Sequence, residues 1–112
     1  MADQGKTVIS MTVPESTGRG RIISGAGTLD AALKGTGVLY EPSDAGQTLG
    51  QVQVAGTCPV VLGETLTAGA ICRSDADGAA VATAGDGSDD FLACVLLLEG
   101  GDADELVEAK II

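Results

Sequence analysis

The sequence predicts an all-β fold, a small barrel or sandwich of about seven to eight short strands with an extended N-terminal arm. Two observations support this prediction. Short apolar runs alternate with polar residues at a period of two, which sends successive side chains to opposite faces of a strand. The 17 glycines among the 112 residues follow no Gly-X-Y period, so they are expected to mark turns between the strands of a single domain.

The core must be aliphatic, because Tyr40 and Phe91 are the only aromatic residues. Aromatic side chains bury about 150–250 Å² each and normally supply the largest contributions to a core. A modest core is therefore expected. A small domain of this kind gains stability from association with a partner or with copies of itself.

The net charge of −10 is distributed unevenly along the chain. Residues 1–56 carry four basic and five acidic groups, whereas residues 57–112 carry two basic and eleven acidic groups. This imbalance argues against nucleic-acid binding, which needs a basic surface. No apolar run approaches a membrane span of about 20 residues, and the N-terminus lacks the layout of a signal peptide. We expect a soluble protein, without a membrane partner, that is made in a host cytoplasm.

Residues 1–20 are expected to form the N-terminal arm, and residues 21–112 the β domain. Residues 7–13 predict a strand that a proline ends, and the sequence ESTGRG that follows is small, polar and flexible. Arg19 and Arg21 are the most basic part of the chain. They form either a solvated loop or a contact with an acidic partner surface.

The next segment predicts short strands joined by turns. Ile22 and Ile23 form an apolar step, and residues 28–33 favour a brief helical turn that Gly35 would end. The sequence Gly-Thr-Gly at residues 35–37 is not a phosphate-binding loop, because no Lys-Ser/Thr pair follows it. Residues 38–40 are expected to be a strand.

A bend is expected near Gly56 and Pro59, which interrupt one extended segment. Before the bend, Val52 and Val54 alternate with Gln51 and Gln53. Glycine and proline within a strand are typical of a bulge or bend, by which a small barrel or sandwich turns a corner.

A hairpin is predicted after the compact turn GETLTAG. The side chain of Leu66 is expected to fill the inside of this turn. Residues 71–74 and 79–82 flank the sequence DADG, and an Asp-Gly step is a strong hairpin signal. The spacing of these aspartates does not match a calcium loop of the EF-hand type. Residues 86–90 (DGSDD) are expected to be a solvated turn.

A second hairpin is predicted at the C-terminus. Residues 91–98 (FLACVLLL) are eight consecutive apolar residues, so both faces of the strand must be covered and it is either central or part of an interface. Residues 106–112 return with Val107, Ala109 and Ile111 alternating with charged residues, as in a half-buried strand.

The sequence lacks the groups of the common catalytic sites. It contains no histidine, which excludes the usual Ser-His and Cys-His nucleophiles. Cys58, Cys72 and Cys94 have no CxxC spacing and are expected to be buried, reduced thiols. Carboxylates are abundant but lie in glycine-rich loops that keep them hydrated. We therefore expect no enzyme activity, cofactor or metal.

Residues 51–112 resemble the small head-decoration or capsid cement proteins of tailed bacteriophages. The resemblance rests on an ordered series of features: a valine-rich strand with a glycine break, the GETLTAG turn, the Asp-Gly hairpin with DGAAVATA, an acidic loop, the apolar strand and the terminal strand VEAKII. It implies a non-enzymatic virion protein that binds the outside of the capsid, often as a trimer, and stabilises the shell. Its partners would be the major capsid protein and copies of itself.

In such proteins the N-terminal arm commonly adds a strand to the capsid lattice. This agrees with residues 2–13 as a detachable strand whose unpaired backbone groups can bond to another sheet. The residues expected to contact the capsid are Thr7, Val8, Ile9, Met11, Arg19 and Arg21. The residues expected at an interface between copies are Phe91, Val95 and Leu97.

Two alternatives share the small, acidic all-β character. A carrier of the lipoyl or biotinyl kind needs a lysine at a hairpin tip, but the lysines are only Lys6, Lys34 and Lys110. A calcium-stabilised adhesion module would use the acidic loops instead.

Overall fold

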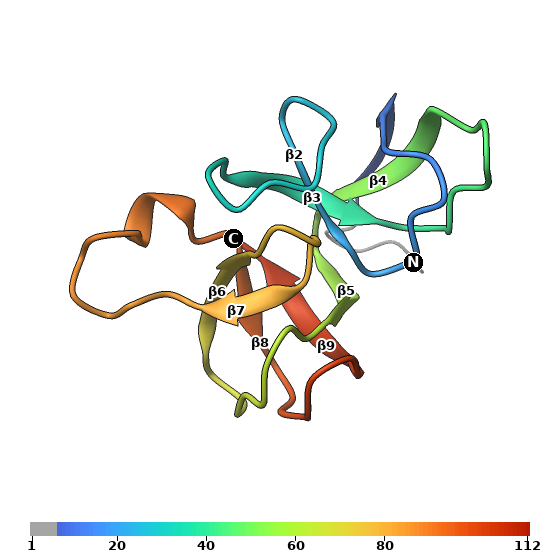
Figure 1. The fold of residues 1–112 in the computed structure, drawn as a ribbon. Coiled ribbons are helices and arrows are strands. Elements are labelled where there is room, and N and C mark those ends of the chain that lie inside the picture. The colour runs from blue at the N-terminus through green and yellow to red at the C-terminus, as the bar shows by residue number, and fades with distance from the viewer. Residues whose placement is uncertain (1–6) are drawn as a thin grey trace.

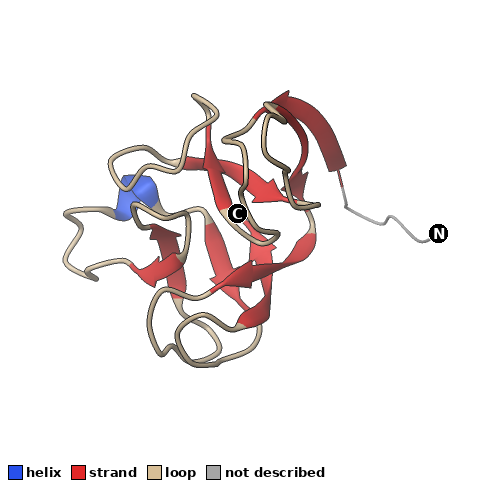
Figure 2. Ribbon diagram, turned by 45° about the vertical axis from the view of Figure 1, so that its right-hand side comes forward, coloured by secondary structure: helices blue, strands red, loops and turns tan. Residues whose placement is uncertain are grey.

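The computed structural model describes residues 7–112, and residues 1–6 of the expected arm lie outside this range. The described chain is all-β, as predicted, and contains a single short helical turn (Figures 1 and 2). The elements are β1 (Thr7–Thr12), β2 (Ile22–Ser24), β3 (Gly35–Leu39), β4 (Leu49–Ala55), β5 (Thr57–Val61), β6 (Ile71–Ser74), β7 (Ala80–Ala82), the 3₁₀ turn η1 (Asp90–Leu92), β8 (Val95–Leu97) and β9 (Leu106–Ile111). No helix of this part of the chain is long and apolar enough to span a membrane.

The strands form two antiparallel sheets, which Figure 1 shows one above the other. The first has the order β1-β4-β3-β2 and the second the order β5-β9-β8-β6-β7. A parallel bridge joins Leu62, just after β5, to Ala80 of β7, and the Gly63 N–H donates to the Ala80 carbonyl at 2.8 Å. The two edges of the second sheet therefore meet, and the sheet curls toward a small barrel.

The chain passes from the first sheet to the second at Gly56, which has a φ of +88° that few other residues adopt. Gln53 holds this corner: its Nε2 donates to the carbonyls of Ala55 at 2.9 Å and Thr57 at 2.7 Å. The predicted bend is confirmed at Gly56. Gln53 is only 1% exposed although it alternates with valines in the sequence, because the corner needs a buried donor.

The core consists of two aliphatic clusters. The larger fills the inside of the second sheet, and Ile22 and Val38 of the first sheet cover it. The smaller lies on the other face of the first sheet and contains Val13, Ile23, Leu39 and Val52. All three cysteines are buried free thiols, as predicted, in the part of the chain that the structure describes.

The segment expected to be an arm is bonded to the domain in this structure. β1 pairs with β4 along its length and forms one edge of the first sheet. Beyond β1, the Ser43 hydroxyl accepts from the Thr17 N–H at 2.8 Å and donates to the Pro14 carbonyl at 2.7 Å. Residues 7–20 are therefore ordered by contacts with the rest of the chain.

The predicted strand over residues 91–98 is too long. Its first part is η1, closed by the i to i+3 bond from the Leu92 N–H to the Asp89 carbonyl, and only Val95–Leu97 are extended. The terminal hairpin itself is confirmed, because β8 pairs with β9 and lies at the centre of the second sheet.

The predicted helical turn at residues 28–33 is also wrong. These residues contain no helix. The Ser24 N–H donates to the Thr28 carbonyl and the Ser24 hydroxyl accepts from the Thr28 N–H, which closes a tight turn at residues 24–28, and residues 29–34 then return the chain to β3. The Asp-Gly hairpin, in contrast, is confirmed by the pairing of β6 with β7. Leu66 plugs its turn as predicted, since it packs against the larger cluster.

Candidate interaction surfaces

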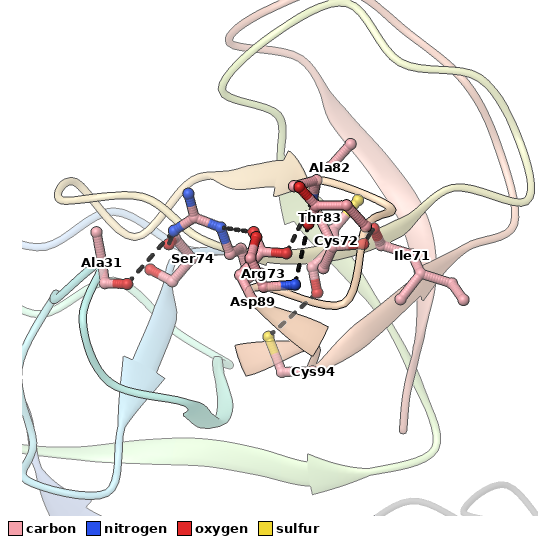
Figure 3. A network of polar contacts seen from close by, with 12 residues as sticks. Ala31, Ile71, Cys72, Arg73, Ser74, Ala82, Thr83, Asp89 and Cys94 are labelled. Atoms are coloured by element: carbon pink, nitrogen blue, oxygen red, sulfur yellow. Dashed lines mark hydrogen bonds and ion pairs between the residues drawn. The ribbon is translucent and has the colours of Figure 1, made fainter. Parts of the chain in front are cut away.

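Two of the buried thiols, Cys72 and Cys94, are held in their protonated form. Burial raises the pKa of Cys72 to about 12, and it raises the pKa of Cys94 to about 11. The Cys94 thiol points at the Cys72 carbonyl oxygen, 3.7 Å from it, inside the second sheet (Figure 3). Since the thiolate is the reactive form, both side chains act as small apolar core groups at neutral pH.

The acidic loops use their carboxylates within the fold. Oδ1 of Asp75 accepts the N–H groups of Asp77 at 2.8 Å and Ala79 at 2.9 Å, which closes the hairpin turn. A hydrogen bond from Ser88 lowers the pKa of Asp86. Over residues 7–112, no three acidic or cysteine side chains converge in a way that could hold a metal ion.

Arg73 connects the acidic loop before η1 to two other parts of the chain (Figure 3). Its Nε forms an ion pair with Asp89 at 2.8 Å, and one terminal nitrogen donates to the Ala31 carbonyl at 3.4 Å. The other oxygen of Asp89 accepts the Ala84 N–H at 2.8 Å. Asp89 therefore closes the loop on itself through Ala84 and ties it to β6 through Arg73, which in turn reaches the turn before β3.

The residues expected to contact the capsid fall on three surfaces. Four of them, Thr7, Val8, Ile9 and Met11, belong to the edge strand β1. Arg21 lines an open polar groove of about 430 Å³ with Asp77 and Asp104, and it donates to the Asp77 carbonyl at 3.3 Å. Arg19 lines a separate groove beside Tyr40. The two arginines do not form one basic patch.

The strand β1 offers a surface because one of its two edges is unpaired within the described chain. Ile9 is 40% exposed, while Val8 and Met11 are half-buried and Met11 packs against the smaller core cluster. An unpaired edge carries free N–H and C=O groups that can accept a further strand. The described part of the expected arm can therefore bind another chain without leaving the domain.

The three residues expected at an interface between copies do not share a surface. Val95 and Leu97 are 1% exposed and fill the core of a single chain, whereas Phe91 on η1 is 68% exposed. The cause is the short length of β8, which removes Phe91 from the strand on which the expectation placed it. Of the three, only Phe91 is available to a partner.

An apolar surface on the outside of the second sheet was not predicted from the sequence. We define the outer apolar face as the outward side chains of β6, β8 and β9 together with the residue that follows β8, namely Ile71, Leu96, Leu106 and Leu98. Ile71, Leu98 and Leu106 are each about half exposed. The unbroken apolar run of residues 91–98 could have indicated this surface, because it contains no polar residue for the outer face of the sheet.

These features define a class of compact all-β domain built from two antiparallel sheets. Among solved structures, the chain is similar to the N base of the head fiber gp8.5 of bacteriophage phi29, with a TM-score of 0.66 and 19% sequence identity over 95% of each chain. No family model matches the sequence, and no curated protein matches it. The predicted resemblance to a protein of the phage head is thus confirmed at the level of the fold.

Proposed function

We propose that this chain is a structural, non-enzymatic protein of a phage virion that binds the exterior of the capsid and stabilises the shell, as a head decoration or cement protein does. The observation that carries the proposal is the fold shared along 95% of both chains with the head fiber base of phi29.

The contact with the major capsid protein would be made by strand addition at the free edge of β1. The backbone of this edge gives affinity, and the exposed side chain of Ile9 lies on the same strand. Arg19 and Arg21 would add contacts with an acidic part of the capsid, each from its own groove. The chain would be made in the host cytoplasm and would then occupy the outer surface of the head.

Association into a trimer would strengthen this contact. When one protomer of an oligomer is bound, the others are held close to their sites, so weak single contacts together become strong. A small aliphatic domain also benefits from the area that copies bury between them.

The proposal is tested by co-sedimentation of the full chain with expanded, empty heads of the phage that encodes it. We expect saturable binding, and heads that carry the protein should resist heating and chelation better than bare heads. A variant that lacks residues 1–12 removes β1 while it keeps the buried Val13. This variant is first checked for a β-type circular dichroism spectrum.

The results separate the parts of the proposal. Failure of the full chain to bind the heads at any concentration argues against a decoration role. Binding by the folded, truncated variant at full strength leaves the decoration role intact but argues against strand addition at β1.

A further inference from the structure

The outer apolar face is a continuous surface because of the strand register. Val95 and Leu97 of β8 point into the core, so Leu96 and Leu98 point outward. Ile71 lies directly opposite Leu96 on the neighbouring strand β6. Side chains opposite each other on one face of an antiparallel pair are in contact distance, so these positions form one patch.

The β9 side of this face adds an apolar residue and two opposite charges. Lys110 lies opposite Leu96 in the register. Leu98 donates its N–H to the Glu108 carbonyl at 2.9 Å, which places Glu108 beside it. Leu106, Glu108 and Lys110 are spaced by two residues, so they share the outer face of β9.

The presence of a lysine distinguishes the outer apolar face from the rest of residues 57–112, which are strongly acidic. Residues 57–112 carry eleven acidic and only two basic groups. Arg73 is engaged with Asp89, whereas Lys110 forms no ion pair with any residue that the structure describes. The outer apolar face therefore combines exposed aliphatic groups with Lys110 and Glu108, while Arg73 on the same face of β6 is paired with Asp89. The turns around the face carry the excess of carboxylates.

We propose that the outer apolar face is the surface through which copies of this chain contact each other, with Lys110 of one copy against Glu108 of the next. A second copy fits the chemistry because the face is complementary to itself: aliphatic groups meet aliphatic groups, and a cation meets an anion. Two copies that met through their acidic turns would repel each other instead. This inference rests on the self-association part of the proposed function and names its surface.

The test begins with the mass of the full chain in solution, measured by sedimentation velocity over a range of concentrations. We expect the wild-type protein to associate and the variant Leu98→Glu to dissociate about tenfold or more readily, since a buried leucine is worth more than the 1.4 kcal/mol of a tenfold change. The matched control is Leu33→Glu, which changes an exposed leucine outside this face. It should associate like the wild type.

A charge exchange tests the pairing without removing apolar area. Lys110→Glu and Glu108→Lys should each weaken association about threefold or more, because each places like charges together. An equimolar mixture of the two variants should recover part of the association, since each contact between unlike copies again joins a lysine to a glutamate and two of the three contacts in a mixed trimer are of this kind. A defect of folding in either variant would not be repaired by mixing.

Each outcome is informative. If Leu98→Glu associates as tightly as the wild type, or if mixing the charge variants restores nothing, the outer apolar face is not the contact between copies. If the wild type stays monomeric at all concentrations, the inference is overturned, while co-sedimentation with heads still reports on the decoration role. Loss of head binding by Leu98→Glu, together with unchanged association, would assign the face to the capsid and overturn the inference as well.

Discussion

Gln53 and Thr57 are joined across the corner between the two sheets by a hydrogen bond of 2.7 Å from the side-chain amide to the backbone carbonyl. The same amide also binds the Ala55 carbonyl, so it satisfies backbone acceptors on both sides of Gly56. A chain that leaves one sheet for another loses the ladder partners that would otherwise satisfy these groups. The buried glutamine replaces them.

We expect Gln53→Leu to lower the free energy of unfolding by about 1–3 kcal/mol, because two partly buried carbonyl groups at the corner lose their donor. The measurement is urea unfolding followed by circular dichroism. Gln51→Leu is the matched control, since this exposed glutamine on the same strand bonds only the Ser10 hydroxyl. Its effect should stay within about 0.5 kcal/mol. Equal effects of the two substitutions would show that the corner does not depend on Gln53.

The close approach of β3 to β4 requires glycine at position 37. A Cβ at this position would meet the Gln53 carbonyl oxygen and the side chain of Val52, neither of which can move freely in the sheet. We expect Gly37→Ala to destabilise the protein by about 1–3 kcal/mol or more. Gly18→Ala is the control, because nothing lies within 4 Å of a Cβ built there. A neutral Gly37→Ala, measured by thermal unfolding, would contradict the tight packing of β3 on β4.

The sequence predicted the fold class, the two hairpins and the corner at Gly56, because these depend on local turn chemistry and on a period of two. It did not predict the burial of Gln53, since an amide that serves a corner looks like any polar residue in an alternating strand. It also misplaced Phe91. The pattern of the eight apolar residues does not indicate where η1 ends and β8 begins. The ion pair that holds the preceding loop joins Arg73 to Asp89, which are far apart in the sequence.

Candidate surfaces were harder to predict than the fold. The sequence indicated that residues 7–13 can act as an edge, and β1 is an edge. The interface residues depended on which face of residues 91–98 points inward, which only the packing of the two sheets decides. The outer apolar face combines β6, β8 and β9, so its members become neighbours only once the register is known.

Arg73→Ala should loosen the acidic loop before η1. The substitution removes the ion pair with Asp89 and the bond to the Ala31 carbonyl. Because the pair is partly exposed, its loss should reduce global stability by only about 1 kcal/mol or less. Local opening is the more sensitive measurement: amide hydrogen exchange should accelerate at Ala84, whose N–H is bound to Asp89. The amide of Ala79, held by Asp75, serves as the internal control.

Calcium should have no effect on stability. Asp75 already binds the backbone of its own turn, and the described acidic side chains do not converge on a cation. A site filled at 100 times its dissociation constant would add about 2.7 kcal/mol, or roughly 10 °C in the melting temperature of a domain of this size. Melting in millimolar calcium and in chelator should therefore coincide. A shift of several degrees would instead favour a calcium-stabilised module.

The buried thiols should make the protein less stable at high pH. In the unfolded chain Cys72 and Cys94 lose their protons near the ordinary pKa of 9.0, whereas in the fold burial raises these pKa values to about 12 and about 11. Between pH 9 and these values the native state holds more protons than the unfolded state, so the free energy of unfolding falls as the pH rises. It should fall by about 1 kcal/mol per pH unit for each thiol.

The double variant Cys72→Ala/Cys94→Ala isolates this contribution from that of lysine and tyrosine. Its stability, measured by urea unfolding, will be lower at pH 7 because two buried groups are shortened, but its decline between pH 9 and pH 11 should be shallower than that of the wild type. At pH 8 the wild-type thiols should react with iodoacetamide only after unfolding, since burial keeps them protonated and inaccessible. Parallel pH profiles of the two proteins, or rapid alkylation of the native wild type, would show that the thiols ionise readily within the fold.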